Sequence, residues 1–173
     1  STTITNLPSN KGPQEEHYVI AKSTSGMFPG WTYNGQPITG KSNDGFMIIN
    51  CGLKMNDEAA LRNGRITNEG MICSFTARGL CEDTWYDFSA EVRDIDFIAS
   101  DIIPTNVRFV AVGLETNEIL MNYETGTISE DDWDHKSKSF NSKKNKNIKL
   151  ILYNNQETNN TSCPIAGSDL GLD

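Results

Sequence analysis

The sequence predicts an all-β domain, an antiparallel β-sandwich or jelly roll of about nine strands. Short segments with alternating or continuous apolar residues recur along the chain, separated by turns rich in Gly, Asn and Pro. This spacing is typical of sandwiches and barrels. The sequence shows no amphipathic helical pattern and no repeat with a period of about 20 to 50 residues.

The predicted strands are short, and turn-forming residues bound each of them. They cover residues 17–21, 46–51, 71–76, 85–92, 107–112, 119–123, 126–129, 136–140, 148–153 and a last strand within 169–173. The nearly continuous apolar run at 46–51 is typical of a buried central strand. Residues 107–112 and 119–123 flank a turn and are expected to form a hairpin.

The segment at 85–92 shows most clearly which strand face is buried, because successive side chains of a strand point to opposite faces. One set is Tyr86, Phe88, Ala90 and Val92, and the other is Trp85, Asp87, Ser89 and Glu91. We expect the more apolar set in the core and Trp85 on the outer face, exposed or covered by a loop. In the last strand, Leu170 and Leu172 alternate in the same way with Asp169, Gly171 and Asp173.

Length and charge restrict the class of protein. At 173 residues the chain predicts a single domain, residues 1–173, with a sizeable core. Its net charge is −8 and its pI about 4.7. This argues against nucleic acid and against anionic membrane surfaces, which both require clustered Lys and Arg. No apolar run approaches the ~20 residues of a membrane span.

The four cysteines indicate an oxidising environment. Cys51, Cys73, Cys81 and Cys163 form no CxxC pair, and the chain has only two His, which argues against a zinc site. An even cysteine count in such a β-rich chain is typical of an extracellular protein. The alternative is four buried free thiols in a cytosolic protein.

Motifs in a fixed order run along nearly the whole chain. They are Gly12-Pro13 before 18–20, Gly45 before 46–50, Gly79-Leu80-Cys81 before 85–92, residues 125–128 with Trp133, residues 150–155, and Cys163 before 167–173. With this set the chain resembles the galactose-binding-like jelly-roll domains of bacterial secreted and cell-surface multidomain proteins. That group is related in fold to many carbohydrate-binding modules. The family usually has Asn where Ser168 and Asp94 stand, and often two consecutive acids where this sequence has Asp173.

The resemblance implies a structural Ca²⁺ ion and a pair of disulfides. Related modules often hold Ca²⁺ where the first strand, a loop and the terminal strand meet, and the corresponding oxygens here belong to Glu15 or Glu16, the turn at 42–44 with Asp44, and Asp173. The alternative is that these are ordinary surface acids. The resemblance also pairs Cys81 with Cys163, which leaves Cys51 with Cys73. Four cysteines permit three connectivities, and the residues themselves do not choose among them.

The candidate ligand residues are aromatic. The apolar faces of sugars stack on Trp and Tyr rings, and Trp31 and Tyr33 lie in a long Gly-rich segment, residues 25–45. Trp85 is the third candidate, whereas the resemblance places Trp133 in the core. For Trp31 and Tyr33 the alternative is packing within the loop.

Catalysis is not expected. The acids have no recognisable glycosidase setting, and neither a Gly-x-Ser-x-Gly elbow nor a His-Glu-x-x-His helix occurs. We therefore expect a non-catalytic, extracellular or cell-surface module that binds a polysaccharide or glycan, as one domain of a larger secreted or surface protein. The alternative is an adhesin or spacer domain that binds a surface protein or no ligand.

Overall fold

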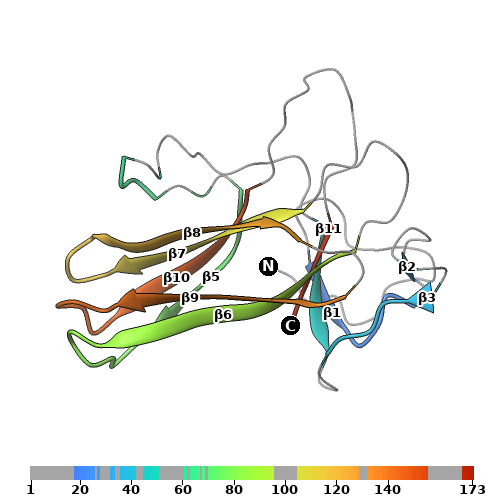
Figure 1. Ribbon diagram of the computed structural model, residues 1–173, viewed down its shortest axis with the longest axis horizontal. Coiled ribbons are helices and arrows are strands. Elements are labelled where there is room, and N and C mark those ends of the chain that lie inside the picture. The colour runs from blue at the N-terminus through green and yellow to red at the C-terminus, as the bar shows by residue number, and fades with distance from the viewer. Residues whose placement is uncertain are drawn as a thin grey trace.

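The computed structural model describes residues 18–25, 27, 32–33, 36–41, 45–50, 61, 63–66, 68, 70–95, 105–128, 132–155 and 169–173. These residues form two antiparallel sheets packed as a β-sandwich, together with a small separate hairpin (Figure 1). The predicted fold class, an antiparallel β-sandwich, is therefore confirmed. Within the described part of the chain, no helix has the length and hydrophobicity needed to cross a membrane.

The larger sheet has five strands. In spatial order they are β1 (Tyr18–Ala21), β4 (Phe46–Asn50), β11 (Asp169–Leu172), β6 (Trp85–Asp94) and β9 (Asp134–Asn141). The second sheet has four strands, ordered β5 (Met71–Ala77), β10 (Ile148–Asn154), β7 (Asn106–Gly113) and β8 (Ile119–Thr127). The separate hairpin consists of β2 (Thr32–Tyr33) and β3 (Gln36–Pro37).

The main core lies between the two sheets. Its buried members include Phe88 and Val92 from β6, Phe109 from β7, Leu152 from β10 and Leu170 from β11. The rings of Phe88 and Phe109 stack across the sheets with centroids 4.7 Å apart. The side-chain alternation expected for β6 is thus observed, and its more apolar set faces the core.

Two smaller clusters cover parts of the outer faces. Leu61 and Ile66 pack on the outer side chains of the four-stranded sheet, among them Val110 and Ile151. This second burial explains why the sequences of β7 and β10 read as continuous apolar runs. On the five-stranded sheet, Ile38 packs with Phe46, Ile48 and Ile95.

The described strands agree closely with those expected from the sequence, with two differences. The long polar segment at 25–45 contains the β2–β3 hairpin, which was not predicted. The short strand predicted at 126–129 is the end of β8, which continues through Thr127. Gly126 adopts a positive φ of 71° there, so the residue that suggested a turn lies inside a strand.

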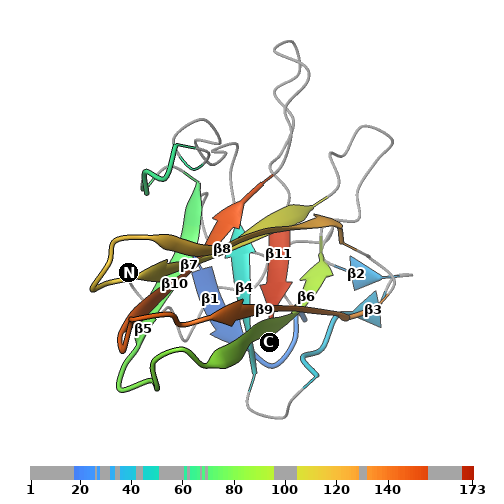
Figure 2. The same ribbon diagram turned by 60° about the vertical axis from the view of Figure 1, so that its left-hand side comes forward.

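β11 lies inside its sheet rather than at an edge. Leu170 is opposite Ile49 of β4 on one side and Asp94 of β6 on the other. The backbone of Asp173 extends this pairing, because its N–H and C=O both bond Glu91, at 2.9 and 3.0 Å. Figure 2 shows β11 between β4 and β6.

Candidate functional site

The candidate site is the outer face of β6 and β9. The antiparallel register sets Trp85 opposite Asn141, Asp87 opposite Ser139, Ser89 opposite Ser137, and Glu91 opposite His135. Opposite residues in a sheet point to the same face. Because Tyr86, Phe88 and Val92 face the core, these eight side chains lie on the outer face, and we call them the polar ladder.

Trp85 stands at one end of the polar ladder and is 69% exposed. The prediction that it would lie on the outer face is confirmed. It is the most exposed of the large hydrophobic side chains in the described part of the chain. Its ring presents a large apolar surface to solvent, and covering such a side chain is favourable by about 1.5–3 kcal/mol.

One side-chain hydrogen bond orients the middle of the ladder. The Ser139 hydroxyl donates to Asp87 Oδ1 over 2.5 Å. Next along the strands, Ser89 and Ser137 are directly opposite each other and both exposed. Hydroxyls and carboxylates of this kind can exchange hydrogen bonds with the hydroxyls of a bound ligand.

Glu91 forms a charged cluster with Lys41 and His135. Its Oε2 lies 2.9 Å from Lys41 Nζ, and its Oε1 lies 3.0 Å from His135 Nδ1. The hydrogen bond from Lys41 lowers the pKa of the Glu91 carboxyl below its usual range, burial opposes this shift, and the hydrogen bond to His135 adds to it. Glu91 is therefore an anchored carboxylate at neutral pH.

Aromatic packing covers the far end of the β6 outer face. Arg93 is buried, and its guanidinium carbon lies 5.5 Å from the centroid of the Tyr33 ring. Beside them, Trp133 packs edge-on against Phe46 at 5.1 Å, and its Nε1 donates to the carbonyl of Thr39 over 3.0 Å. The expectation that Trp133 packs into the fold agrees with these contacts.

The predicted ligand aromatics do not all meet in one place. Tyr33 lies over Arg93, eight residues along β6 from Trp85, which corresponds to about 26 Å of strand. Tyr33 is half-buried and packs in the cluster around Phe46, so it marks the far end of the face. Trp31 lies outside the described residues.

The residues of the predicted calcium site fall mostly outside the described part of the chain. Glu15, Glu16 and Asp44 are not described, whereas Asp173 lies at the end of β11 with its backbone paired to Glu91. Among the described residues, no group of three His, Cys, Asp or Glu side chains is placed to hold a metal ion. The Ca²⁺ site stays a prediction.

Two of the four cysteines are described, Cys73 and Cys81, and they are not bonded to each other. Cys81 is exposed in the turn before β6, and Cys73 lies on β5, where burial raises the pKa of its thiol. Their predicted partners, Cys163 and Cys51, lie outside the described residues. The pairings Cys81–Cys163 and Cys51–Cys73 therefore stay predictions.

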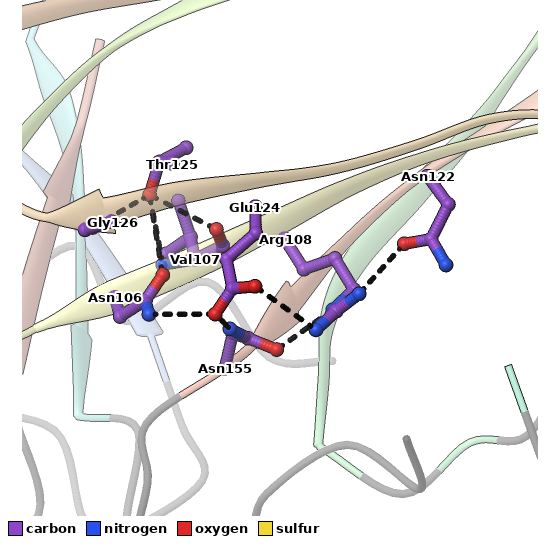
Figure 3. A network of polar contacts seen from close by, with 8 residues as sticks. All are labelled: Asn106, Val107, Arg108, Asn122, Glu124, Thr125, Gly126 and Asn155. Carbon is purple, nitrogen blue, oxygen red and sulfur yellow. Dashed lines mark hydrogen bonds and ion pairs between the residues drawn. The ribbon is translucent and has the colours of Figure 1, made fainter. Parts of the chain in front are cut away.

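A second polar cluster lies on the other sheet (Figure 3). The buried Arg108 donates from Nε to Asn155 Oδ1 at 2.7 Å and from Nη1 to Asn122 Oδ1 at 2.9 Å. Glu124 lies 3.6 Å from the guanidinium and accepts a hydrogen bond from Asn155. The cluster joins β7, β8 and Asn155, the residue after β10. Because other side chains of the protein already bond this guanidinium, the cluster is better suited to a structural role.

Sequence reasoning found Trp85 but missed the partners that make it part of a ladder. The signal for Asp87, Ser89 and Glu91 was present, because they alternate with the core residues of the same strand. His135, Ser137 and Ser139 could not be assigned to the site, since pairing two strands far apart in sequence requires their register.

Comparison with solved structures finds carbohydrate-binding modules. The CBM22-1 xylan-binding domain of Xyn10C from Paenibacillus barcinonensis aligns with a TM-score of 0.47 and 10% identity, over 78% of this chain and 72% of that one. A structure described as "CBM4 structure and function" aligns with a TM-score of 0.44 and 11% identity, over 95% of this chain and 88% of that one. The CBM22-1 and GH10 modules of Clostridium thermocellum endo-1,4-beta-D-xylanase 10B, complexed with xylohexaose, align at 0.37 and 11% identity, over 91% of this chain and 23% of that one. No protein-family model matches the sequence, and no curated protein is significantly similar to it.

Proposed function

We propose that this chain is a non-catalytic carbohydrate-binding module whose glycan lies along the polar ladder. The observation that carries the proposal is Trp85, whose ring is 69% exposed at the end of a row of paired polar side chains. Sugars present apolar CH faces and a rim of hydroxyls, so an aromatic ring beside hydrogen-bonding groups suits them.

The chemistry of the ladder favours binding over catalysis. Its closest approach to an acid–base pair is Glu91 with His135, and Lys41 already holds that carboxylate. No cysteine lies in the ladder, and its serine nearest to His135 across the sheet, Ser89, lies opposite Ser137 and not opposite His135. Nucleophilic catalysis needs the base within hydrogen-bond reach of the nucleophile.

The wider setting belongs to the same proposal. An extracellular or cell-surface location within a larger protein fits the acidic charge of −8 and the β-sandwich architecture. A structural Ca²⁺ ion would be held by Glu15 or Glu16, Asp44 and Asp173, with oxygen ligands of the kind that Ca²⁺ prefers.

Replacing Trp85 tests the proposed site. We expect Trp85→Ala to weaken retention in affinity electrophoresis on a soluble polysaccharide that retains the parent chain. The loss should be about two- to tenfold, since aromatic stacking is worth about 0.5–1.5 kcal/mol and each 1.4 kcal/mol is a factor of ten. Leu114→Ala is the matched control, because Leu114 is 48% exposed in the β7–β8 turn of the other sheet.

Three outcomes separate the alternatives. Weakening by Trp85→Ala and not by Leu114→Ala supports the ladder as the site. Equal retention of Trp85→Ala and the parent would remove Trp85 from the site, and a parallel Trp31→Ala variant would then show whether the loop at 25–45 binds instead. Failure of the parent to bind any polysaccharide on a glycan array would contradict the proposed function.

A further inference from the structure

Aromatic rings close the polar ladder at one end. The next outward position of β6 after Glu91 is Arg93, which is buried, and the Tyr33 ring lies over its guanidinium at 5.5 Å. The residue before β9 is Trp133, whose ring packs edge-on against Phe46 of β4 with centroids 5.1 Å apart. Packed side chains therefore occupy the place where the next row of the ladder would lie. We call Tyr33, Arg93 and Trp133 the wall.

A second layer of chain supports the wall. A Cβ on Gly171 of β11 would lie 3.0 Å from Cη2 of Trp133, so the indole ring lies directly on the outer face of the sheet. Its Nε1 donates to the carbonyl of Thr39, and Lys41, two residues farther along, reaches Glu91 Oε2 at 2.9 Å. This segment therefore ties Trp133 to the last row of the ladder. The β2–β3 hairpin, which carries Tyr33, lies toward the end of β6 and far from its start (Figure 1).

A glycan that lies along the ladder cannot continue past the wall. Trp85 and Glu91 are six residues apart on β6, which corresponds to about 20 Å of strand. This length accommodates several sugar units, and any unit beyond Glu91 would meet the packed rings of Tyr33 and Trp133. We propose, on the basis of the proposed carbohydrate site, that the ladder recognises the end of a glycan chain and holds its terminal unit against the wall.

The groups at the foot of the wall suit the extra hydroxyl of a terminal sugar. A terminal unit has a free hydroxyl at the position where an internal unit carries the next sugar. The Lys41 and His135 side chains are 52% and 60% exposed, and both contact the Glu91 carboxylate. An ammonium group has three N–H donors, so Lys41 can donate to this hydroxyl while it holds Glu91. The His135 nitrogen remote from Glu91, Nε2, can exchange a hydrogen bond with the same unit.

Hexasaccharides with blocked ends test the proposal. The probes are the neutral, linear xylohexaose, cellohexaose and mannohexaose, each unmodified, reduced to the alditol at the reducing end, or O-methylated on the 4-hydroxyl of the non-reducing terminal unit. Calorimetric titration of the full chain measures the Kd of each form. One modification should weaken binding by about tenfold or more, the loss expected for one hydrogen bond to a charged group. The other modification, at the end remote from the wall, should leave the Kd unchanged.

The direction of the bound chain gives a second measurement. A nitroxide label on the end that tolerates modification should broaden the amide signals of Trp85 and Asn141 in isotope-labelled protein. The amides of Glu91 and His135 lie about 20 Å farther along the strands and should be broadened less. Equal broadening of the two pairs would contradict the binding of one chain end at the wall.

Two substitutions at Tyr33 test the wall itself. Tyr33→Ala removes the ring that lies over Arg93, so it should reduce the difference in Kd between unmodified and blocked probes several-fold. Tyr33→Phe keeps the ring and is the matched control, and it should preserve the difference.

Three further results would overturn the proposal. They are equal effects of the two end modifications, an unchanged discrimination in Tyr33→Ala, and failure of all three hexasaccharides to bind. Tight binding of both modified forms would place an internal stretch of glycan on the ladder, so it would leave the proposed carbohydrate site intact. If no hexasaccharide binds, retention of the parent chain on a polysaccharide shows that chain-end recognition alone has failed, whereas its absence contradicts the proposed function as well.

Discussion

Asn145 links two turns at one end of the sandwich through side-chain hydrogen bonds. It is fully buried in the β9–β10 turn. Its Oδ1 accepts hydrogen bonds from the Thr116 N–H at 3.0 Å and the Thr116 hydroxyl at 3.1 Å, and its Nδ2 donates to the Ser142 carbonyl at 3.0 Å. Through Asn145, the β9–β10 turn is therefore fixed to the β7–β8 turn.

The missing side chain of Gly113 leaves the space that Asn145 occupies. Substitutions at these two positions should therefore have coupled effects on the free energy of unfolding. A Cβ on Gly113 would lie 2.3 Å from the Asn145 amide. Asn145→Ala should lower the free energy of unfolding by about 2 kcal/mol through lost hydrogen bonds. Gly113→Ala should destabilise the protein by about 1–3 kcal/mol through overpacking. Urea denaturation of both variants and of the double variant measures these effects.

The double variant is the sharper measurement. Once Asn145 is truncated, the Cβ of an alanine at position 113 meets no amide. The double variant should therefore be destabilised by less than the sum of the two single substitutions. Lys144→Ala, at the exposed neighbour in the same turn, should stay within about 0.5 kcal/mol of the parent. Strict additivity would contradict the contact between Gly113 and Asn145.

The Glu91 carboxyl should contribute to the loss of stability of the folded protein at acidic pH. The pKa of its carboxyl is lower in the folded chain, first because of the hydrogen bond from Lys41. A lowered folded-state pKa contributes stability that is present above the unfolded value, about 4.3, and is lost as the pH falls through the folded value. Glu91→Gln should therefore reduce the stability difference between pH 6 and pH 3, measured by urea denaturation.

Lys41→Gln provides the companion measurement for Glu91. Removing the ammonium group removes the main cause of the lowered pKa, so this variant should also lose less stability on acidification than the parent. If both variants follow the parent curve from pH 6 to pH 3, the cluster makes no contribution to acid sensitivity.

At the scale of elements, the packing of β11 against its neighbours requires a glycine at position 171. A Cβ on Gly171 would lie 3.0 Å from Cη2 of Trp133 and 3.3 Å from carbons of Ile95 and Phe46. Gly171→Ala should therefore lower the melting temperature, at a cost of about 1–3 kcal/mol for overpacking. In a Trp133→Leu variant, Gly171→Ala should lower the stability by less. An equal loss of stability in the parent and in Trp133→Leu would show that Trp133 is not the residue that the added Cβ overpacks.

The sequence predicted single elements better than the relations between them. Alternation in residues 85–92 was sufficient to place Phe88 in the core and Trp85 outside, because that decision depends only on neighbouring positions. The β2–β3 hairpin was missed because strands of two residues carry no periodicity. The ladder was missed for another reason. The partners of Trp85 and Glu91 are Asn141 and His135, and only the register of distant strands brings them together.

At the scale of the whole molecule, thermal unfolding with and without Ca²⁺ tests the predicted calcium site of Glu15 or Glu16, Asp44 and Asp173. If these residues share an ion, saturating Ca²⁺ should raise the melting temperature of EDTA-treated protein. A ligand that binds only the folded state stabilises it by about 2.7 kcal/mol at a hundredfold excess over Kd. Asp173→Asn should weaken this effect, and identical melting curves with EDTA and with Ca²⁺ would contradict the site.

The position of β11 has a consequence for the time course of folding. Leu170 pairs with Ile49 and with Asp94, so within the described part of the chain β1 and β4 join the sheet of β6 through β11, near residue 170. Loop-closure entropy opposes such distant contacts, and domains dominated by them fold in milliseconds to seconds. During synthesis, the first two strands of this sheet must therefore wait, without their central neighbour, until almost the whole sequence has left the ribosome. That interval is when their exposed edges are most open to aggregation.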